Sequence, residues 1–291
     1  MKTSAFLTFG YIIILLIHTT DLVNAQTESI IYTNKVGRNA NLHTVNLDGS
    51  NNVKITGNPS SDSAPSYSPK GDFIVFNSER NGWWKIWKMN SDGSELEQVS
   101  FPGTGADYDP TISPNGNIVA FTSSRDKNEE IYIKRINENS PSINLTKTQG
   151  DQRYPRWISN NEILYYDTSG EHHIIMTMNL SGEIIREFNL GLGNNYMGDI
   201  SKNGDLVFTS DRDGSNDLYI LFSNEKEPVK ITESEGLIDY RAKWSVDGNK
   251  IVYERSNRKN ISQIWVYDLI SKTLKQHTKS GYNYYPSWVI R

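Results

Sequence analysis

The sequence predicts an all-β fold, a six-bladed β-propeller made of four-stranded antiparallel blades. Three observations predict it. One motif occurs six times at nearly constant spacing, each repeat holds short strand patterns, and no stretch has a sustained helical period. A repeat of about 40–50 residues that contains four strands is typical of a propeller blade. Six repeats are enough to close into a ring.

The clearest element of each repeat is a pair of apolar residues followed by an aromatic one, which predicts the second strand of a blade. These aromatic residues lie 44, 45, 45, 42 and 45 positions apart. They are Tyr32, Phe76, Phe121, Tyr166, Phe208 and Tyr253. The regular spacing indicates that each repeat folds as one unit of the same kind.

The first strand of most repeats is predicted by a Pro-x-aromatic-Ser-Pro-x-Gly motif, in which Pro and Gly mark the following turn. The motif is complete at 65–71 and nearly complete at 110–116. Degenerate copies lie at 155–157, 198–204, 242–248 and 286–288.

The third and fourth strands have weaker patterns. Alternating apolar and polar residues predict third strands at 85–89, 130–134, 217–221 and 263–267. Short segments that end in Thr or Ser predict fourth strands at 53–56, 98–100, 144–146 and 229–232. Asp-Gly pairs, typical of tight turns between antiparallel strands, occur at 48–49, 92–93 and 247–248.

The two ends of the chain predict how the ring closes. The segment 286–288 is a first-strand motif with no second strand after it. The segment 30–32 is a second-strand motif with no first strand before it. We expect the N- and C-terminal strands to complete one blade together, which leaves no open sheet edge.

The composition excludes several kinds of site. The 291 residues include 30 Lys and Arg and 34 Asp and Glu, so the net charge of −4 gives no general attraction for nucleic acid. The chain has no Cys, which excludes disulfides, thiolate catalysis and Cys-ligated zinc. We expect no nucleic-acid partner and no cofactor.

Residues 1–25 are predicted to be a signal peptide. Lys2 comes before the apolar run 5–17, and Val23 and Ala25 are the small residues expected before a cleavage site at Gln26. The run is too short for a stable membrane span, which needs about 20 residues. We expect a periplasmic or secreted protein whose residues 26–291 form one propeller domain.

Ser-x-Arg hairpins complete the repeat, at 78–80, 124–126 and 210–214. With the first- and second-strand motifs they make residues 28–291 resemble the TolB-like propeller family. That resemblance implies a six-bladed propeller and the family's habit of binding protein partners, an envelope lipoprotein among them. The additional N-terminal α/β domain of TolB is expected to be absent here. Similar blades occur in gating domains of prolyl-peptidase relatives and in some polysaccharide lyases, so the fold alone leaves the function open.

The residues that enter each first strand are predicted to surround the mouth of the central channel. The candidate ligand-binding residues are Tyr108, Asp109, Arg153, Tyr154, Arg156, Tyr196, Asp199, Tyr240, Arg241, Lys243, Tyr284 and Tyr285. Tyr offers a large rigid surface with a hydroxyl, and Arg can pair with a carboxylate through two nitrogens. The set therefore predicts a site for a polar ligand or a peptide. In the alternative, the tyrosines pack between blades with their hydroxyls bonded to backbone.

Within that set, Arg156, Asp199 and Lys243 lie one residue after the Pro-equivalent position. They are expected to line the channel. Two roles fit them, a contact with ligand or an ion network around trapped water.

Trp83 and Trp84 form an aromatic pair on a predicted hairpin. They are the candidate partner surface, because exposed aromatic area marks interaction sites. Packing over the edge of a blade is the alternative.

No catalytic or metal site is predicted. The histidines after the leader are His43, His172, His173 and His277, and none lies on a first-strand motif. The Gly-x-Ser-x-Gly motif of serine hydrolases is absent. The predicted function is therefore a non-catalytic module that binds a protein or peptide. The alternative is a carbohydrate-binding or oligosaccharide-lyase propeller that uses the channel mouth.

Overall fold

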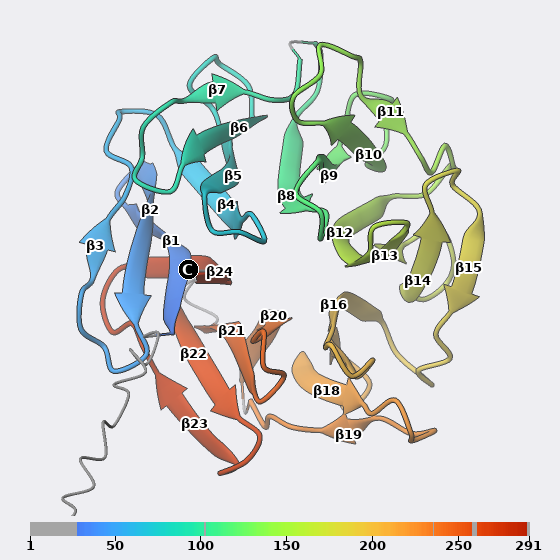
Figure 1. Ribbon diagram of the computed structural model, residues 1–291. Helices are drawn as coiled ribbons and strands as arrows, with labels where there is room; N and C mark the ends of the chain where they lie inside the picture. Colours follow the sequence, from blue (N-terminus) through green and yellow to red (C-terminus); the bar gives the residue numbers. More distant parts are fainter. Residues whose placement is uncertain (1–27, 102, 235, 258–260, 290–291) are drawn as a thin grey trace, which may run out of the picture.

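The computed structural model describes residues 28–101, 103–234, 236–257 and 261–289. Within these ranges the chain forms 24 β-strands in six four-stranded antiparallel sheets, and no helix. Figure 1 shows the six sheets arranged radially around a central axis. The predicted six-bladed propeller is confirmed. The predicted signal peptide lies outside the described residues.

The blades are numbered from the one that holds the start of the described chain. Blade 1 consists of β24 (Tyr282–Val289), β1 (Ser29–Val36), β2 (Asn39–Asn46) and β3 (Val53–Lys54). Blade 2 consists of β4 (Asp62–Tyr67), β5 (Phe73–Ser78), β6 (Lys85–Asn90) and β7 (Glu97–Gln98). Blade 3 consists of β8 (Asp107–Ile112), β9 (Ile118–Ser123), β10 (Glu130–Arg135) and β11 (Ile143–Asn144).

The remaining blades follow the same order. Blade 4 consists of β12 (Gln152–Ser159), β13 (Glu162–Asp167), β14 (Ile174–Asn179) and β15 (Ile184–Glu187). Blade 5 consists of β16 (Asn195–Ile200), β17 (Leu206–Ser210), β18 (Asp217–Leu221) and β19 (Val229–Lys230). Blade 6 consists of β20 (Leu237–Trp244), β21 (Lys250–Asn257), β22 (Ser262–Asp268) and β23 (Thr273–Gln276).

Blade 1 is built from both ends of the chain, as predicted. Strand β24 pairs with β1 in antiparallel register, so that Ile30 lies opposite Trp288. The side chain of Asn34 adds a hydrogen bond of 2.7 Å from its Nδ2 to Oδ1 of Asn283. Because β24 is the inner strand of this blade, closing the ring also completes the wall of the channel.

The hydrophobic core lies between neighbouring blades. The aromatic residues of the six second-strand motifs are all buried. In one cluster Phe76 of blade 2 packs with Ile31 of blade 1, and in another Tyr253 of blade 6 packs with Val207 of blade 5. Burial at every blade boundary explains why the aromatic position repeats through the sequence.

The Ser-x-Arg hairpins connect the second and third strands of a blade, and their arginines reach back to the first strand. Arg125 donates from Nη2 to Asp107 Oδ1 at 2.8 Å and from Nε to Ser123 Oγ at 2.8 Å. Its guanidinium also lies 4.5 Å from the centre of the Tyr132 ring. Arg80, Arg212 and Arg255 make equivalent contacts in blades 2, 5 and 6. These arginines therefore have a structural role.

Inner-strand tryptophans connect consecutive blades. The indole Nε1 donates to a backbone carbonyl of the preceding inner strand, from Trp157 to Thr111, from Trp244 to Asp199 and from Trp288 to Lys243. The distances are 3.0–3.2 Å.

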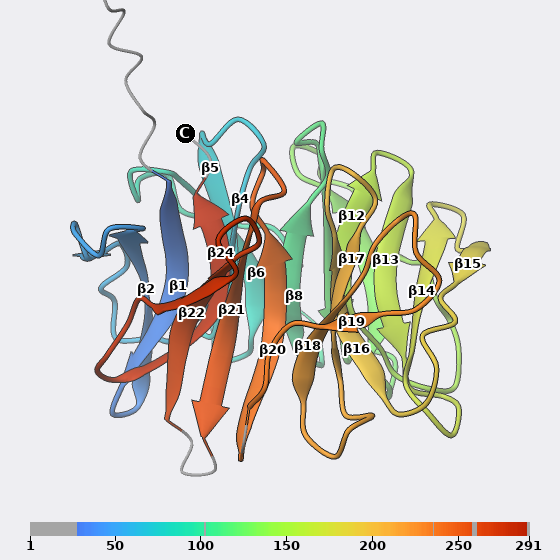
Figure 2. The same cartoon turned by 90° about the horizontal axis from the view of Figure 1, so that it is seen from below.

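The two faces of the ring are defined by the direction of the inner strands. We call the face where these strands begin the entrance face and the face where they end the exit face. Strand β24 points toward the upper side in Figure 2, which is the exit face. Among the described residues, no helix is long and apolar enough to cross a membrane.

Candidate functional site

Each inner strand contains one residue in the left-handed backbone conformation, always at the same position of the repeat. These residues are Ala64, Asp109, Tyr154, Met197, Arg241 and Tyr285, with φ between 51° and 59°. In every blade the pairing with the second strand shifts at this point, as in a β-bulge. A bulge bends its strand and re-aims the side chains around it.

The bulges divide the channel wall into three rings of side chains. The entrance ring is the residue before each bulge: Ser63, Tyr108, Arg153, Tyr196, Tyr240 and Tyr284. The bulge ring is the six left-handed residues. The cavity ring lies two residues further on: Ser66, Thr111, Arg156, Asp199, Lys243 and Ser287.

The left-handed conformation is held by hydrogen bonds from the preceding blade. The amide of Ala64 donates to Thr33 Oγ1 at 3.1 Å, and that of Tyr154 donates to Thr122 Oγ1 at 3.2 Å. The amide of Tyr285 donates to Glu254 Oε2 at 3.3 Å. Left-handed conformations cost about 1–3 kcal/mol in residues other than Gly and persist where their surroundings fix them. The neighbouring blade supplies that constraint here.

The tyrosines of the entrance ring are half-buried, and two of their hydroxyls donate hydrogen bonds to side chains. Tyr196 donates to Asn216 Oδ1 at 2.5 Å, and Tyr108 donates to Glu129. Burial raises the pKa of Tyr240 to about 12, so its phenol is neutral at physiological pH. The hydroxyls of Tyr108 and Tyr196 bond to side chains. The alternative interpretation of the tyrosines expected their hydroxyls to bond to the backbone.

Other aromatic residues extend the entrance ring that the sequence predicted. Tyr282 lies 5.0 Å from Tyr284 between ring centres, on the same strand. Tyr166 and His173 both lie about 6 Å from Tyr196. Tyr282 was missed, although its place two residues before Tyr284 puts it on the same face of a strand. His173 lies on the connection that precedes a third strand, and no motif in the sequence marks it.

Arg153 of the entrance ring is paired with two carboxylates. Its Nη2 lies 2.8 Å from Asp151 Oδ2, and its Nε pairs with Glu129. Burial raises the pKa of Glu129. In the entrance ring, the charge of Arg153 is therefore balanced by the carboxylates of Asp151 and Glu129.

The bulge ring fills the middle of the channel. Tyr154, which is 2% exposed, comes from blade 4, and Tyr285 comes from the opposite blade 1, yet both belong to one cluster. Arg241 lies over the Tyr285 ring at 4.1 Å and donates from Nη1 to Glu254 Oε2 at 2.9 Å. Asp109 contributes a buried Oδ1 with no hydrogen bond. Tyr154 was predicted at the mouth, but the structure buries it inside the channel.

The cavity ring lines a cavity of about 200 Å³ at the exit end. Val246 is 70% exposed and also lines it, so the cavity opens to solvent on that face. The structure thus places Arg156, Asp199 and Lys243 at the end opposite the entrance ring, whereas the sequence placed all three at one mouth.

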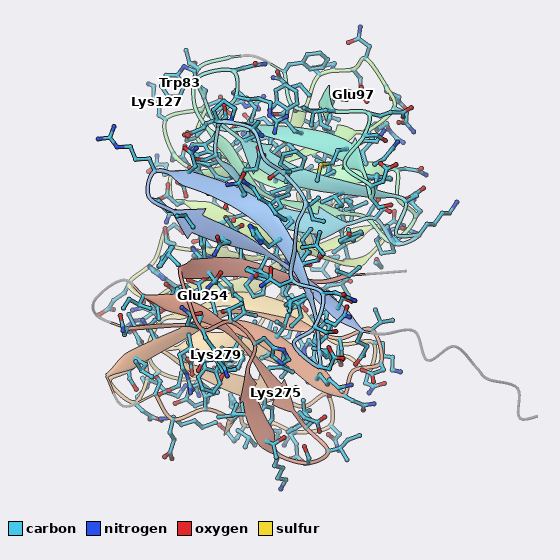
Figure 3. All side chains as sticks on the ribbon, turned by 90° about the vertical axis from the view of Figure 1, so that its left-hand side faces the viewer. Trp83, Glu97, Lys127, Glu254, Lys275 and Lys279 are labelled. Atoms are coloured by element: carbon cyan, nitrogen blue, oxygen red, sulfur yellow. The ribbon has the colours of Figure 1, made fainter. Side chains whose placement is uncertain are left out.

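The predicted tryptophan pair is split by the fold. Trp83 is 60% exposed, whereas Trp84 is half-buried and its carbonyl accepts the amide of Asp107 in the next blade. Figure 3 places Trp83 and Lys127 toward one face of the ring and Glu97 toward the other. Since Trp84 contacts the start of an inner strand, the Trp83 side is the entrance face.

Two histidines line a groove away from the channel. His43 and His277 face it together with Lys275 and Lys279, and its volume is about 550 Å³. In the ranges that the structure describes, no group of three or more His, Asp or Glu side chains is arranged to hold a metal ion.

Comparison with known proteins finds a family model that matches more than half of the chain. A family model described as the TolB beta propeller domain, PD40, matches residues 24–198. An uncharacterised protein of Agrobacterium fabrum is 34% identical over 82 residues, which are 28% of each chain. The Tol-Pal system protein TolB of Syntrophus aciditrophicus is 32% identical over 74 residues, 24% of this chain and 16% of that protein.

Solved structures show the same fold. TolB from Acinetobacter baumannii superposes with a TM-score of 0.76 at 18% identity, covering 90% of this chain and 66% of that one. A chain of the nidogen/laminin complex superposes with a TM-score of 0.69 at 11% identity, covering 90% and 98%. The aligned segments span less than a third of the two curated relatives.

Proposed function

Because the chain belongs to the family of TolB β-propeller domains, we propose that it is an exported, non-catalytic module that binds a protein or peptide at its entrance face. The observation that carries this proposal is the entrance ring, in which four of six positions are tyrosines, beside the exposed Trp83. Aromatic side chains with a polar end are enriched in protein interfaces.

The entrance ring is organised in a way that favours binding. The hydroxyls of Tyr108 and Tyr196 are already bonded, so these two rings lose little side-chain freedom when a partner covers them. Arg153 and its carboxylate neighbours add charges of both signs beside the rings. We expect a segment with apolar side chains for the rings and at least one charged group.

The location and the class of partner follow from the sequence and the relatives. The leader pattern at 1–25 supports export to the periplasm or the medium. A relative from Syntrophus aciditrophicus carries the Tol-Pal system in its name. A protein of the cell envelope, such as a lipoprotein, is therefore the first partner to test.

Cross-linking in envelope extract tests the proposal. The full chain is compared with a Tyr240→Ala/Tyr284→Ala variant, with Trp83→Ala, and with Ile185→Ala as a control. Ile185 is an exposed apolar residue on the outer strand β15, away from the channel. We expect one protein to be cross-linked by the wild type and the control and to be lost or strongly reduced in the other two.

The remaining outcomes are distinct. A protein captured equally by all four chains would contradict the entrance face as the binding site. If no protein is captured, but an oligosaccharide binds or is cleaved and the double variant loses this, the carbohydrate alternative replaces the proposal. Circular dichroism of each variant shows whether a loss comes from unfolding.

A further inference from the structure

The cavity ring is divided into a charged half and a hydroxyl half. The charged half comes from three consecutive blades, 4, 5 and 6, as Arg156, Asp199 and Lys243. The hydroxyl half comes from blades 1, 2 and 3, as Ser287, Ser66 and Thr111. One side of the cavity is therefore ionic, and the other offers three hydroxyl donors.

The charged half carries one more positive than negative side chain. Two cations, Arg156 and Lys243, share a single carboxylate, Asp199, which gives a formal charge of +1. That carboxylate is already partly used, because its Oδ2 accepts the amide of Trp244 at 2.8 Å. Asp109 in the bulge ring also attracts Lys243, more weakly than Asp199 does.

Both cations retain unused hydrogen-bonding capacity. Among the residues that the structure describes, none forms a hydrogen bond or ion pair with the Lys243 ammonium. Arg156 is only 6% exposed, and its buried Nε–H has no partner. Its Nη1 donates to the Pro155 carbonyl at 2.7 Å, and its guanidinium stacks on Tyr154 at 3.7 Å, which fixes its position.

Arg156 is buried, Lys243 is partly buried, and the two share one carboxylate. Cations removed from water are costly when their charge is not balanced, and proteins normally pair them. We propose that the exit cavity binds a small anion, a carboxylate or a phosphate, between Lys243 and Arg156. The hydroxyls of Ser66, Thr111 and Ser287 donate to it from the other side. A guanidinium fork and an ammonium are the groups that proteins use for these anions.

Electrostatics in the cavity agree with this assignment. Burial, and then the charge of Arg156, hold the pKa of Lys243 well below its ordinary value. The ammonium is thus unfavourable in the free protein, and a bound anion would stabilise it. Burial raises the pKa of Asp199, which weakens the one competing negative charge.

The volume of the cavity favours a small-molecule ligand. A volume of about 200 Å³ holds about six waters at ~30 Å³ each, which suits a small molecule. Trp157, Trp244 and Trp288 line it as well. The site lies at the other end of the channel from the entrance ring, so it does not rest on the proposed partner binding.

Thermal unfolding of the full chain tests the proposal. Chloride is replaced by acetate, succinate or phosphate at constant ionic strength, and a ligand that binds only the folded chain raises the midpoint. We expect at least one of these anions to raise it. A larger effect of phosphate assigns a phosphate site, and a larger effect of acetate or succinate assigns a carboxylate site.

Variants locate the effect. Lys243→Met is expected to weaken the affinity about tenfold or more, the effect of losing a hydrogen bond to a charged group, while Lys243→Arg keeps it. Lys279→Met is the control, because Lys279 is exposed and lies outside the cavity. Equal stabilisation of wild type and Lys243→Met, or no stabilisation by any anion, would overturn the proposal.

A second measurement needs no variant and decides the matter if Lys243→Met does not fold. Reductive methylation of wild-type lysines is followed by mass spectrometry with and without the anion. We expect the anion to slow labelling of Lys243 and to leave Lys279 unchanged. Unchanged labelling of Lys243 would contradict the site. Loss of anion binding with intact partner capture separates this proposal from the proposed function.

Discussion

Arg241 lies over the ring of Tyr285, with its guanidinium carbon 4.1 Å from the ring centre. The two residues come from β20 of blade 6 and β24 of blade 1, so this contact joins blade 6 to the strand that closes the ring. Glu254 accepts hydrogen bonds from Arg241 at 2.9 Å and from the amide of Tyr285 at 3.3 Å. One carboxylate therefore fixes both the bulge of the closing strand and the cation beside it.

Loss of this carboxylate is predicted to be strongly destabilising. Glu254 is 0% exposed, and Glu254→Ala would leave the partly buried Arg241 without its ion-pair partner. Breaking a buried pair in this way costs about 3–5 kcal/mol. Urea denaturation should show a drop of that size in the free energy of unfolding. The free energy of unfolding of Glu254→Gln should lie between those of the wild type and Glu254→Ala, because Gln keeps a hydrogen-bond acceptor and loses the charge.

Glu97→Ala is the matched control for that experiment. Glu97 is 61% exposed and lies 3.8 Å from Lys88, so its ion pair is worth about 0–1 kcal/mol. Similar losses in Glu254→Ala and Glu97→Ala would disprove the role of the buried carboxylate.

The fold could be predicted from the sequence because each motif of the repeat occupies the same structural position in every blade. The buried aromatic position of the second strand recurs at Phe76, Phe121 and Phe208, and all three are 0% exposed. The unpaired motifs at 30–32 and 286–288 predicted the shared blade, and β1 does pair with β24.

The candidate site was predicted only in part, because the bulges have no sequence signal. Left-handed residues are usually Gly, yet Tyr154 and Arg241 are held in this conformation by the fold. Each cavity-ring residue follows its entrance-ring residue by three positions, or about 10 Å of strand. Tyr240 and Lys243 thus face different ends of the channel although they are near neighbours in sequence.

The left-handed bulge predicts an unusual response to glycine. Ala64 has φ of 51°, where a Cβ is unfavourable, so Ala64→Gly should leave stability unchanged or raise it by up to about 1 kcal/mol. Ala120 is a buried residue of the regular strand β9, so Ala120→Gly should lower the free energy of unfolding by about 1–2 kcal/mol. Thermal unfolding of both variants compares them. A greater loss for Ala64→Gly than for Ala120→Gly would show that the bulge carries no strain.

His277 predicts a loss of stability in mild acid. Burial, and then the charge of Lys275, lower the pKa of His277 to about 4. The unfolded chain takes up this proton near pH 6.5, so the free energy of unfolding should fall as the pH drops from about 6.5 to 4. Allowing for its partial exposure, the contribution is about 1–2 kcal/mol.

His277→Gln should flatten this part of the pH profile, as measured by urea denaturation at several pH values. His172→Gln is the control, because His172 is exposed and not in the groove. If both variants keep the slope of the wild type, His277 is not the group that causes it.

Binding of acetate in the exit cavity is predicted to weaken as the pH rises. Acetate keeps its charge above pH 6, whereas the Lys243 ammonium, whose pKa is lowered, loses its proton at a lower pH than an ordinary lysine does. The groups that act on this amine are Arg156 from β12, Asp199 from β16 and Asp109 from β8. Asp199, whose pKa is raised, also becomes more negative with rising pH, so both changes oppose the anion.

Isothermal titration of acetate between about pH 6 and 9 should show falling affinity in the wild type. Lys243→Arg should show a flatter profile, because an arginine stays charged throughout this range. An equally steep decline in Lys243→Arg would place the titrating group elsewhere.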